Sequence, residues 1–305
     1  MVRLTTTISQ TARTIATGFC AAVAWALCGG AALADQPHEW ELGMQAAATP
    51  ITERIHEFHD VLLVIIFAIS LFVFALLIIV MVRFNHRSHP VPTRTSHNTV
   101  IELLWTVVPV LILVTIAIPS FKLMYYMDRV PDSKMTVKVT GHQWYWEYTY
   151  PDNGNIDFNS NLIPEKDLKP GEPRLLDVDN PLVIPADTTI RVQVAGSDVI
   201  HSWFVPSFGV QEYAVIGRLN EAWMRVLHPG TYYGECNQIC GVNHAFMPIK
   251  VVAMSQDDFQ KWLTDAKTKF SSLDKPKDNA TQVAAADRAP AVLPVADASA
   301  QAGNR

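Results

Sequence analysis

Cysteine is scarce in this sequence, which has four among 305 residues. Cys20 and Cys28 lie in an N-terminal stretch with the features of a secretory signal, so its removal would leave Cys236 and Cys240 alone. In an oxidising compartment, this composition excludes a spare thiol that would compete for disulfide bonding with those two. The two remaining cysteines, Cys236 and Cys240, are only four residues apart in the sequence.

A periodic apolar pattern is missing from Asp274 to the C-terminus, where Ala, Pro, Asp and Gln predominate. Such a composition buries too little apolar surface to offset the entropy lost on folding. We therefore predict that residues 274–305 are a disordered tail, outside the folded part of the chain.

A signal peptide is predicted at residues 1–34. Arg3 and Arg13 make the start basic, the stretch from Ile15 to Ala26 is apolar, and Ala-Leu-Ala at 32–34 has the pattern of a cleavage site. An uncleaved anchor is the alternative, but the apolar stretch is shorter than the roughly 20 residues that cross a bilayer. We expect cleavage before Asp35.

Hydrophobic residues make up 49% of the chain, and much of this content lies in two runs of membrane length. The run at 61–82 is almost entirely apolar and, as a helix, would extend about 33 Å, enough to cross a bilayer. The second run, at about 101–121, contains Glu102 together with two threonines and two prolines, which suggests packing against protein. We therefore predict a transmembrane hairpin at 60–126, after an external segment at 35–59.

The charges that flank these runs predict the orientation of the hairpin. The connecting loop carries Arg83, Arg87 and Arg94, whereas the segment before the first run is acidic. By the positive-inside rule the loop is cytoplasmic, so both termini and everything after Tyr125 lie outside. A secretory signal predicts the same topology independently.

Strand periodicity begins after the second run. In the segment 189–194, Ile190, Val192 and Val194 fall on one face, as in a half-buried strand. Further strands are predicted at 136–139, 144–150, 182–184, 224–227, 231–233 and 249–253. Together they suggest an antiparallel β-sandwich domain over residues 128–254. An amphipathic helix is predicted at 255–273, with Ser255 as its N-cap.

A set of soft-metal ligands is concentrated in the run ECNQICGVNHAFMP, which contains Cys236, Cys240, His244 and Met247, and an isolated His201 precedes it. Sulfur ligands select soft ions and imidazole suits copper and zinc alike, so the set favours copper. A disulfide and a Cys2His2 zinc site remain as alternatives, although neither accounts for Met247. A single-copper site needs one thiolate, whereas two coppers bridged by both sulfurs would each gain one imidazole. Met247 would then complete one copper and the backbone carbonyl of Gln238 the other.

This run resembles the binuclear CuA loop of cytochrome c oxidase subunit II, whose usual form is CSEICGxNHxFMP. The resemblance extends through GHQWYWEYTY at 141–150, DVIHSWFVPSFGV at 198–210 and GRLN at 217–220, and covers about residues 50–265. It implies a cupredoxin-like Greek-key domain carrying two copper ions. Gln238 stands where the family usually has Glu, whose carboxylate reaches a magnesium ion shared with subunit I. A neutral amide binds a hard cation less well, which leaves magnesium doubtful here.

The resemblance also implies how electrons arrive. In family members the first Trp of the GHQWYW stretch receives the electron from cytochrome c, a role that falls to Trp144. Docking of the basic face of cytochrome c calls for acids, and Asp152, Asp179, Asp198 and Glu147 are the candidates. Ordinary packing of the aromatic rings and an ordinary solvated acidic face are the alternatives.

Glu102 stands at the start of the second apolar run. An ionisable residue there either reaches to the membrane surface or takes part in proton transfer. In the family the matching Glu lies at the mouth of a proton channel of subunit I, so we assign that role to Glu102.

We therefore interpret the chain as the electron-accepting subunit II of an aa3-type cytochrome c oxidase in a bacterial inner membrane, with its larger domain in the periplasm. It would take electrons from cytochrome c and pass them to haem in subunit I, where oxygen reduction and proton pumping occur. The expected partners are subunits I and III, cytochrome c and membrane lipid, and no nucleic acid. The CuA subunit of a nitric oxide reductase and a membrane-tethered copper chaperone or zinc protein are the rival interpretations.

Overall fold

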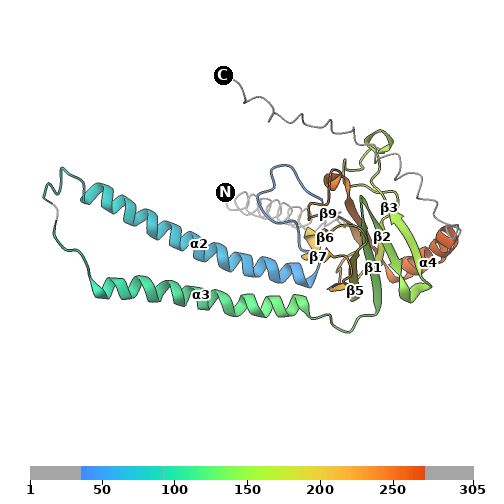
Figure 1. Cartoon of the computed structure of the whole chain (residues 1–305), viewed down its shortest axis with the longest axis horizontal. Helices are drawn as coiled ribbons and strands as arrows, with labels where there is room; N and C mark the ends of the chain where they lie inside the picture. The colour runs from blue at the N-terminus through green and yellow to red at the C-terminus, as the bar shows by residue number, and fades with distance from the viewer. Residues whose placement is uncertain (1–35, 92, 272–305) are drawn as a thin grey trace, which may run out of the picture.

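A computed structural model describes residues 36–91 and 93–271 and shows two long helices joined to a β-sandwich (Figure 1). The predicted signal peptide and the predicted tail lie outside the described residues. The helices are α2 at Pro50–Arg83 and α3 at Thr99–Asp128, and they contain the apolar runs at 61–82 and 101–121. This arrangement confirms the predicted fold class.

The two helices begin at well-defined caps. Pro50 occupies the first turn of α2, and the hydroxyl of Thr49 accepts a hydrogen bond from the backbone N–H of Thr52 at 3.2 Å. Asn98 caps α3 by accepting from two backbone N–H groups of its first turn. The helix α2 thus starts well before its apolar run, and its first turns reach the sandwich.

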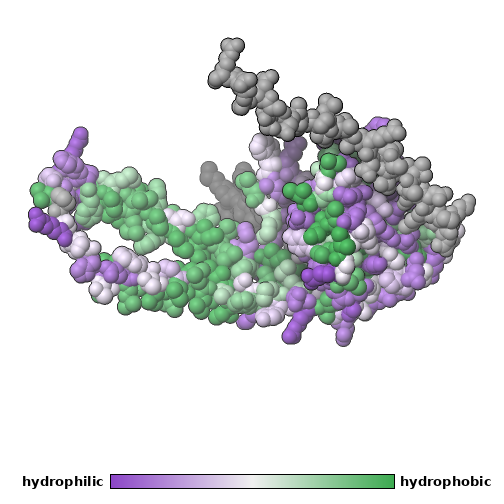
Figure 2. All heavy atoms as spheres, in the orientation of Figure 1, coloured by the Kyte–Doolittle hydropathy of each residue, from purple (hydrophilic) through white to green (hydrophobic). Residues whose placement is uncertain are grey.

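The surface of the hairpin is apolar and uncovered. Within the described chain, α2 is buried only at Ile51 and Thr52, and α3 nowhere. Figure 2 shows hydrophobic residues over most of both helices and polar residues at the connection between them. Such a large apolar surface is stable only in a bilayer or against partner proteins.

The sandwich consists of two five-stranded sheets, in the orders β3-β2-β1-β5-β8 and β4-β10-β9-β6-β7. The strands of the first sheet are β1 Met135–His142, β2 Tyr145–Tyr150, β3 Ile156–Ser160, β5 Ile190–Gly196 and β8 Asn220–Met224. Those of the second are β4 Leu182–Pro185, β6 His201–Val205, β7 Val210–Ala214, β9 Gly230–Cys236 and β10 Pro248–Met254. The core between the sheets includes the buried rings of Trp146, Tyr148 and Trp203.

The sandwich, predicted to be antiparallel, also contains two parallel strand pairs. The strands β1 and β5 pair in parallel, with Val137 opposite Val192, and β4 pairs in parallel with β10. Alternation of apolar residues is the same in both kinds of pairing, so the sequence pattern cannot distinguish them.

Strand prediction also missed three elements and misplaced a fourth. The strands β3, β6 and β7 were not predicted, and the strand expected at 224–227 is β8, which ends at Met224. In β6 the side chains of His201, Ser202 and Trp203 are all buried, so the strand has little alternation to detect.

The helix α4 at Gln256–Ser271 covers one side of the sandwich. The hydroxyl of Ser255 accepts from the backbone N–H of Asp258 at 3.2 Å, as the predicted N-cap requires. Trp262 packs against the rings of Tyr150 and Phe158, and Phe270 stacks on Phe158.

Side-chain hydrogen bonds fasten the start of α2 to the sandwich. The hydroxyl of Thr49 donates to the carbonyl of Phe208 at 2.7 Å, and that of Thr52 donates to the carbonyl of Ser207 at 2.8 Å. Both hydroxyls are buried, so these bonds hold the hairpin in a fixed place on the domain.

Candidate metal centre

Three elements bring the predicted ligands together at one end of the sandwich. His201 is the first residue of β6 and Cys236 the last residue of β9, and these strands pair with Trp203 opposite Cys236. Cys240 and His244 lie in the loop between β9 and β10, and Met247 directly precedes β10. A distant strand and a single loop therefore assemble the site.

Each thiol lies beside the other thiol and beside one imidazole. The two Sγ atoms are 3.8 Å apart, Cys236 Sγ lies 4.0 Å from His201 Nδ1, and Cys240 Sγ lies 3.6 Å from His244 Nδ1. A disulfide would place the sulfurs about 2.05 Å apart, so both cysteines are free thiols in this structure. The structure thus shows no disulfide at this pair.

These distances fit a shared metal. Two sulfurs bound to one ion at about 2.3 Å each, in tetrahedral geometry, lie about 3.8 Å apart. The ligand atoms of His201, Cys236 and Cys240 all lie within 4.8 Å of one another, and these residues are buried. The donor set of thiols and imidazole is therefore suited to a soft metal ion.

The other predicted ligands line the same loop. The carbonyl oxygen of Gln238 lies 3.3 Å from Cys236 Sγ. Met247 is almost completely buried, and its carbonyl accepts from the backbone N–H of Cys236 at 3.1 Å. Both residues are thus held close to Cys236.

Asp198 fixes the orientation of the His201 ring. Its Oδ1 lies 2.9 Å from His201 Nε2, which leaves Nδ1 facing the cysteines. Burial alone would raise the pKa of Asp198, but hydrogen bonds from His201 and from the backbone N–H groups of Gln143 and Val199 hold it below its ordinary value. The carboxylate therefore stays ionised and keeps its hold on the imidazole.

The two thiols are electrostatically unequal. Burial alone would raise the pKa of Cys236, but hydrogen bonding to His201 and to nearby backbone groups lowers it. Burial raises the pKa of Cys240, and the neighbouring Cys236 adds to the rise. The contact with His201 therefore favours a thiolate at this pair, and binding of a metal by both sulfurs releases the protons that they still carry.

Gly141 in β1 makes room for the His201 ring and was not predicted as a site residue. A Cβ atom there would lie 2.8 Å from His201 Cδ2 and 2.9 Å from Cγ. The ring is completely buried and held by Asp198, so it has little freedom to move away. Gly141 belongs to the GHQWYW stretch that carries the family resemblance. Its role could not be predicted from that stretch, because the role depends on contact with His201 in a distant strand.

Substitution Gly141→Ala is expected to weaken binding of a metal at the predicted site and to lower the free energy of unfolding by about 1–3 kcal/mol, because it overpacks the His201 ring. Denaturant unfolding and a copper titration would measure both effects. The matched control is Gly43→Ala, where a Cβ atom meets nothing within 4 Å. Wild-type copper affinity in Gly141→Ala would contradict the role assigned to this contact.

Trp144 lies against the metal-binding loop. It sits in the turn between β1 and β2, partly buried, and its Nε1 donates to the carbonyl of Cys240 at 3.1 Å. The side chain of Gln143 donates to the same carbonyl at 2.8 Å. Gly241 permits this approach, because a Cβ atom there would lie 2.9 Å from the Trp144 ring. The indole is thus one hydrogen bond from a predicted ligand residue.

Three of the four predicted docking acids lie near the Trp144 end of the sandwich. Asp198 accepts from the backbone N–H of Gln143, Glu147 Oε2 lies 2.7 Å from His142 Nε2, and Asp179 accepts from Asn161, which follows β3. Asp152 instead accepts from the backbone N–H of Thr136 at the start of β1. Six positions along β1 separate that point from His142, roughly 20 Å at the rise of a strand. The structure does not bring Asp152 together with the other three.

Glu102 is part of the N-terminal cap of α3, far along the chain from the sandwich. Its Oε1 accepts from the backbone N–H of Asn98 at 3.2 Å, and the residue is half-buried. This contact resembles a capping box and gives Glu102 a structural role at the end of the hairpin.

Comparison with known proteins identifies both parts of the chain. The family described as "Cytochrome C oxidase subunit II, periplasmic domain" matches residues 135–254, and the corresponding transmembrane domain matches residues 37–123. The "Probable cytochrome c oxidase subunit 2" of Rickettsia bellii (strain RML369-C) is 50% identical over 230 residues, which are 75% of this chain and 86% of that protein. The "Cytochrome c oxidase subunit 2" of Oenothera berteroana is 47% identical over 240 residues, 77% of this chain and 93% of that protein.

A solved structure is also similar. The crystal structure of the periplasmic domain of subunit II of cytochrome oxidase of Bradyrhizobium japonicum has 47% sequence identity and a TM-score of 0.44, covering 47% of this chain and 99% of that one. The match of the transmembrane domain to the two apolar helices shows that the protein is a membrane protein. Because the matched domains together span most of the chain and the relatives are matched over most of their length, the chain belongs to the cytochrome c oxidase subunit II family.

Proposed function

We propose that this chain is the copper-bearing, electron-accepting subunit of an aa3-type cytochrome c oxidase. The observation that carries the proposal is the pairing of two thiols at 3.8 Å, each with its own imidazole. A single-copper site would need one thiolate, and a zinc site would leave the buried Met247 without a role. Two thiols, each beside one imidazole, supply the side-chain donors that a centre of two copper ions requires.

The residues present fit the two copper ions of CuA. Cys236 and Cys240 would bridge them, His201 and His244 would each bind one, and Met247 and the carbonyl of Gln238 would complete the set. When bound, the pair supplies reversible one-electron storage. The protein contributes a buried cage built on two strands and a short loop, and Asp198 fixes the imidazole of His201 within it.

Electrons from cytochrome c would arrive through Trp144. Its indole is partly exposed, and its hydrogen bond to the Cys240 carbonyl provides a short connection to a bridging residue. Asp179, Asp198 and Glu147 would give this end of the sandwich the negative charge that attracts a basic partner. Electrons would pass on to haem in subunit I, where oxygen reduction is coupled to proton pumping.

Subunits I and III would cover part of the hairpin, and lipid the rest. The arginines of the loop between α2 and α3 favour a cytoplasmic position for that loop, which places the sandwich in the periplasm of a bacterial inner membrane. Cytochrome c would then reach the Trp144 end from the periplasmic side.

Low-temperature electron paramagnetic resonance of the full chain, purified in detergent and loaded with copper, tests the proposal. One unpaired electron shared equally by two coppers gives a hyperfine pattern with more lines and a narrower spacing than an electron on one copper. We expect the shared pattern, with copper quantified per chain. A single-copper pattern, or zinc in place of copper, would contradict the proposed centre.

Replacing Glu102 by Gln is expected to slow steady-state oxygen reduction without changing the copper spectrum. The amide oxygen of Gln can still accept the hydrogen bond from Asn98, so the cap of α3 survives while the ionisable group is lost. Turnover of the assembled oxidase, measured with saturating cytochrome c, reports the effect. Normal turnover in this variant would leave Glu102 with only its capping role.

A further inference from the structure

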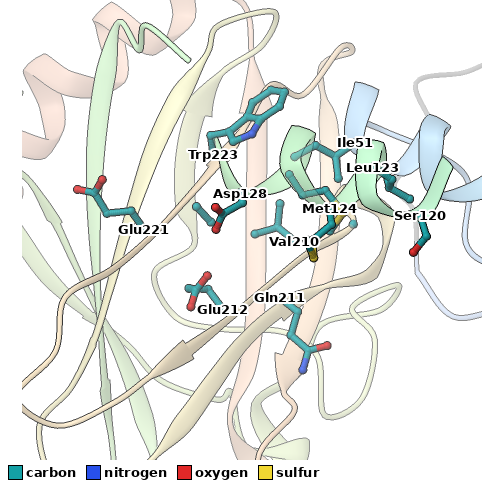
Figure 3. A pocket seen from close by; sticks show the side chains of 13 residues that line it. Ile51, Ser120, Leu123, Met124, Asp128, Val210, Gln211, Glu212, Glu221 and Trp223 are labelled. Atoms are coloured by element: carbon teal, nitrogen blue, oxygen red, sulfur yellow. The ribbon is translucent and has the colours of Figure 1, made fainter. Parts of the chain in front are cut away.

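A cavity of about 370 Å³ lies where the hairpin meets the sandwich, away from the metal centre (Figure 3). The start of α2, the last turns of α3 and the strands β7 and β8 build its walls. The volume is in the range of small-molecule sites in proteins. None of the residues that line it is a predicted metal ligand or Trp144.

The cavity lies at the depth of lipid headgroups. One face of α3 lines it with Ser120, Leu123, Met124, Met127 and Asp128, which follow the spacing of a single helix face. The predicted apolar run ends near 121, and Asp128 lies about 12 Å beyond Ser120 along the helix axis. The headgroup layer on each side of a bilayer is about 5–8 Å thick, so the cavity begins at the hydrocarbon edge and spans this layer, with the backbone of Asp128 just past its outer boundary.

The outer end of the cavity is acidic and its inner end apolar. In the view of Figure 3, Asp128, Glu212 and Glu221 lie on one side, with the carboxylate of Glu221 directed away from the other two, and Ile51 and Met124 lie on the other side. Among the described residues that line the cavity, none is basic. The lining therefore complements a ligand that has an apolar part and a positive charge.

Two of these carboxylates lack a counter-ion in the cavity. Within residues 36–91 and 93–271, the carboxylate of Asp128 forms no hydrogen bond or ion pair. The carboxylate of Glu212 accepts only from the backbone N–H of Tyr213. Glu221 is instead engaged by Gln193 and Arg191. Burial raises the pKa of Glu212; the hydrogen bond from Tyr213 and the charge of Arg218, which is not among the residues that line the cavity, oppose this rise, and the charge of Asp128 adds to it. A cation placed between Asp128 and Glu212 would relieve this repulsion.

A metal ion does not suit the cavity. Among the described residues, the only group of three or more acids, histidines or cysteines whose ligand atoms all lie within 4.8 Å of one another is His201, Cys236 and Cys240. The carboxylates of Asp128, Glu212 and Glu221 are therefore too far apart to surround one ion. An extended organic cation fits the observed spacing better.

We propose that this cavity binds the ethanolamine headgroup of a phosphatidylethanolamine molecule. The primary ammonium donates hydrogen bonds to Asp128 and Glu212, and Trp223 lines the same cavity. The phosphate lies between the ammonium and the acyl chains, which run along the α3 face toward Ser120. The depth of the cavity in the membrane, the negative charge at its outer end and its apolar inner end together favour this lipid. The inference is independent of the copper site.

The test counts lipids on the oxidase purified with its partner subunits and reconstituted in nanodiscs of phosphatidylethanolamine and phosphatidylglycerol. Native mass spectrometry after detergent release is expected to show one phosphatidylethanolamine retained by the wild type and lost from the double variant Asp128→Asn, Glu212→Gln. Retention should fall by about tenfold or more, because two charge-assisted hydrogen bonds are lost. Nanodiscs of phosphatidylcholine should give no retained lipid here, since its quaternary ammonium has no N–H.

Two further variants keep the test decisive. Asp132→Asn removes a nearby exposed carboxylate outside the cavity and should retain the lipid. Ala222→Phe fills the cavity with its charges intact and should expel the lipid. Equal retention by the wild type and the double variant would overturn the proposal. So would loss of a partner subunit with unchanged lipid, which would indicate that the two carboxylates contact that subunit and not a lipid.

Discussion

Substitution Cys236→Ala is expected to abolish the binuclear copper signal. The thiol of Cys236 lies between the Sγ of Cys240 and the imidazole of His201, so its loss removes one of the two proposed bridging ligands. Copper per chain should fall to half or less, and any remaining signal should be that of a single ion. Copper analysis and paramagnetic resonance of the purified chain would measure both effects.

Stability measurements separate loss of the metal from loss of the fold. Copper at about 100 times its dissociation constant stabilises the wild type by roughly 2.7 kcal/mol, and the variant should lack most of this gain. Without copper the two proteins should differ far less, because Ala adds no unpaired polar group to the buried site. The control Asn237→Ala changes an exposed side chain in the same loop and should keep the copper. An intact binuclear signal in Cys236→Ala would rule out the assigned bridge.

Local spacing made the membrane hairpin and the metal loop predictable. The apolar runs in α2 and α3 are longer than a helix in the core of a domain of this size needs to be. Four predicted metal ligands lie within one loop: Cys236, Cys240, His244 and Met247. Both features could therefore be predicted from residues that are close together in the chain. His201 was predicted only because its residue type and the family resemblance singled it out.

Long-range pairing could not be read from the sequence. The parallel register of β1 with β5 joins segments with the same alternation as any antiparallel pair, and the buried strand β6 has almost no alternation. The space that Gly141 leaves for His201 depends on two distant strands. Asp152 and Asp179 look alike as exposed acids, and only the fold places one about 20 Å along β1 from the Trp144 turn. The cavity at the hairpin joint depends likewise on four separate elements.

Substitution Trp144→Phe is expected to slow electron transfer from cytochrome c by about tenfold or more, the equivalent of about 1.4 kcal/mol or more in the barrier. Phenylalanine lacks the Nε1–H group that donates to the Cys240 carbonyl, and its smaller ring leaves a gap toward the docking surface. Gln143 still donates to that carbonyl, so the loop should keep its shape and its copper. Stopped-flow reduction by cytochrome c would show the loss, while the copper spectrum stays that of the wild type.

Measurements at raised ionic strength and on a second tryptophan variant distinguish a slower docking step from slower electron transfer through Trp144. If Asp179, Asp198 and Glu147 attract cytochrome c, raising the salt slows the encounter in both proteins alike, because screening acts on docking and not on the indole. Trp40→Phe alters an indole that is 94% exposed and far along the chain from the metal loop, and it should transfer electrons at the wild-type rate. A Trp144→Phe variant that regains the wild-type rate at saturating cytochrome c would act through docking alone. A rate that stays low at saturation places the indole in the electron path, as its contact with Cys240 leads us to expect.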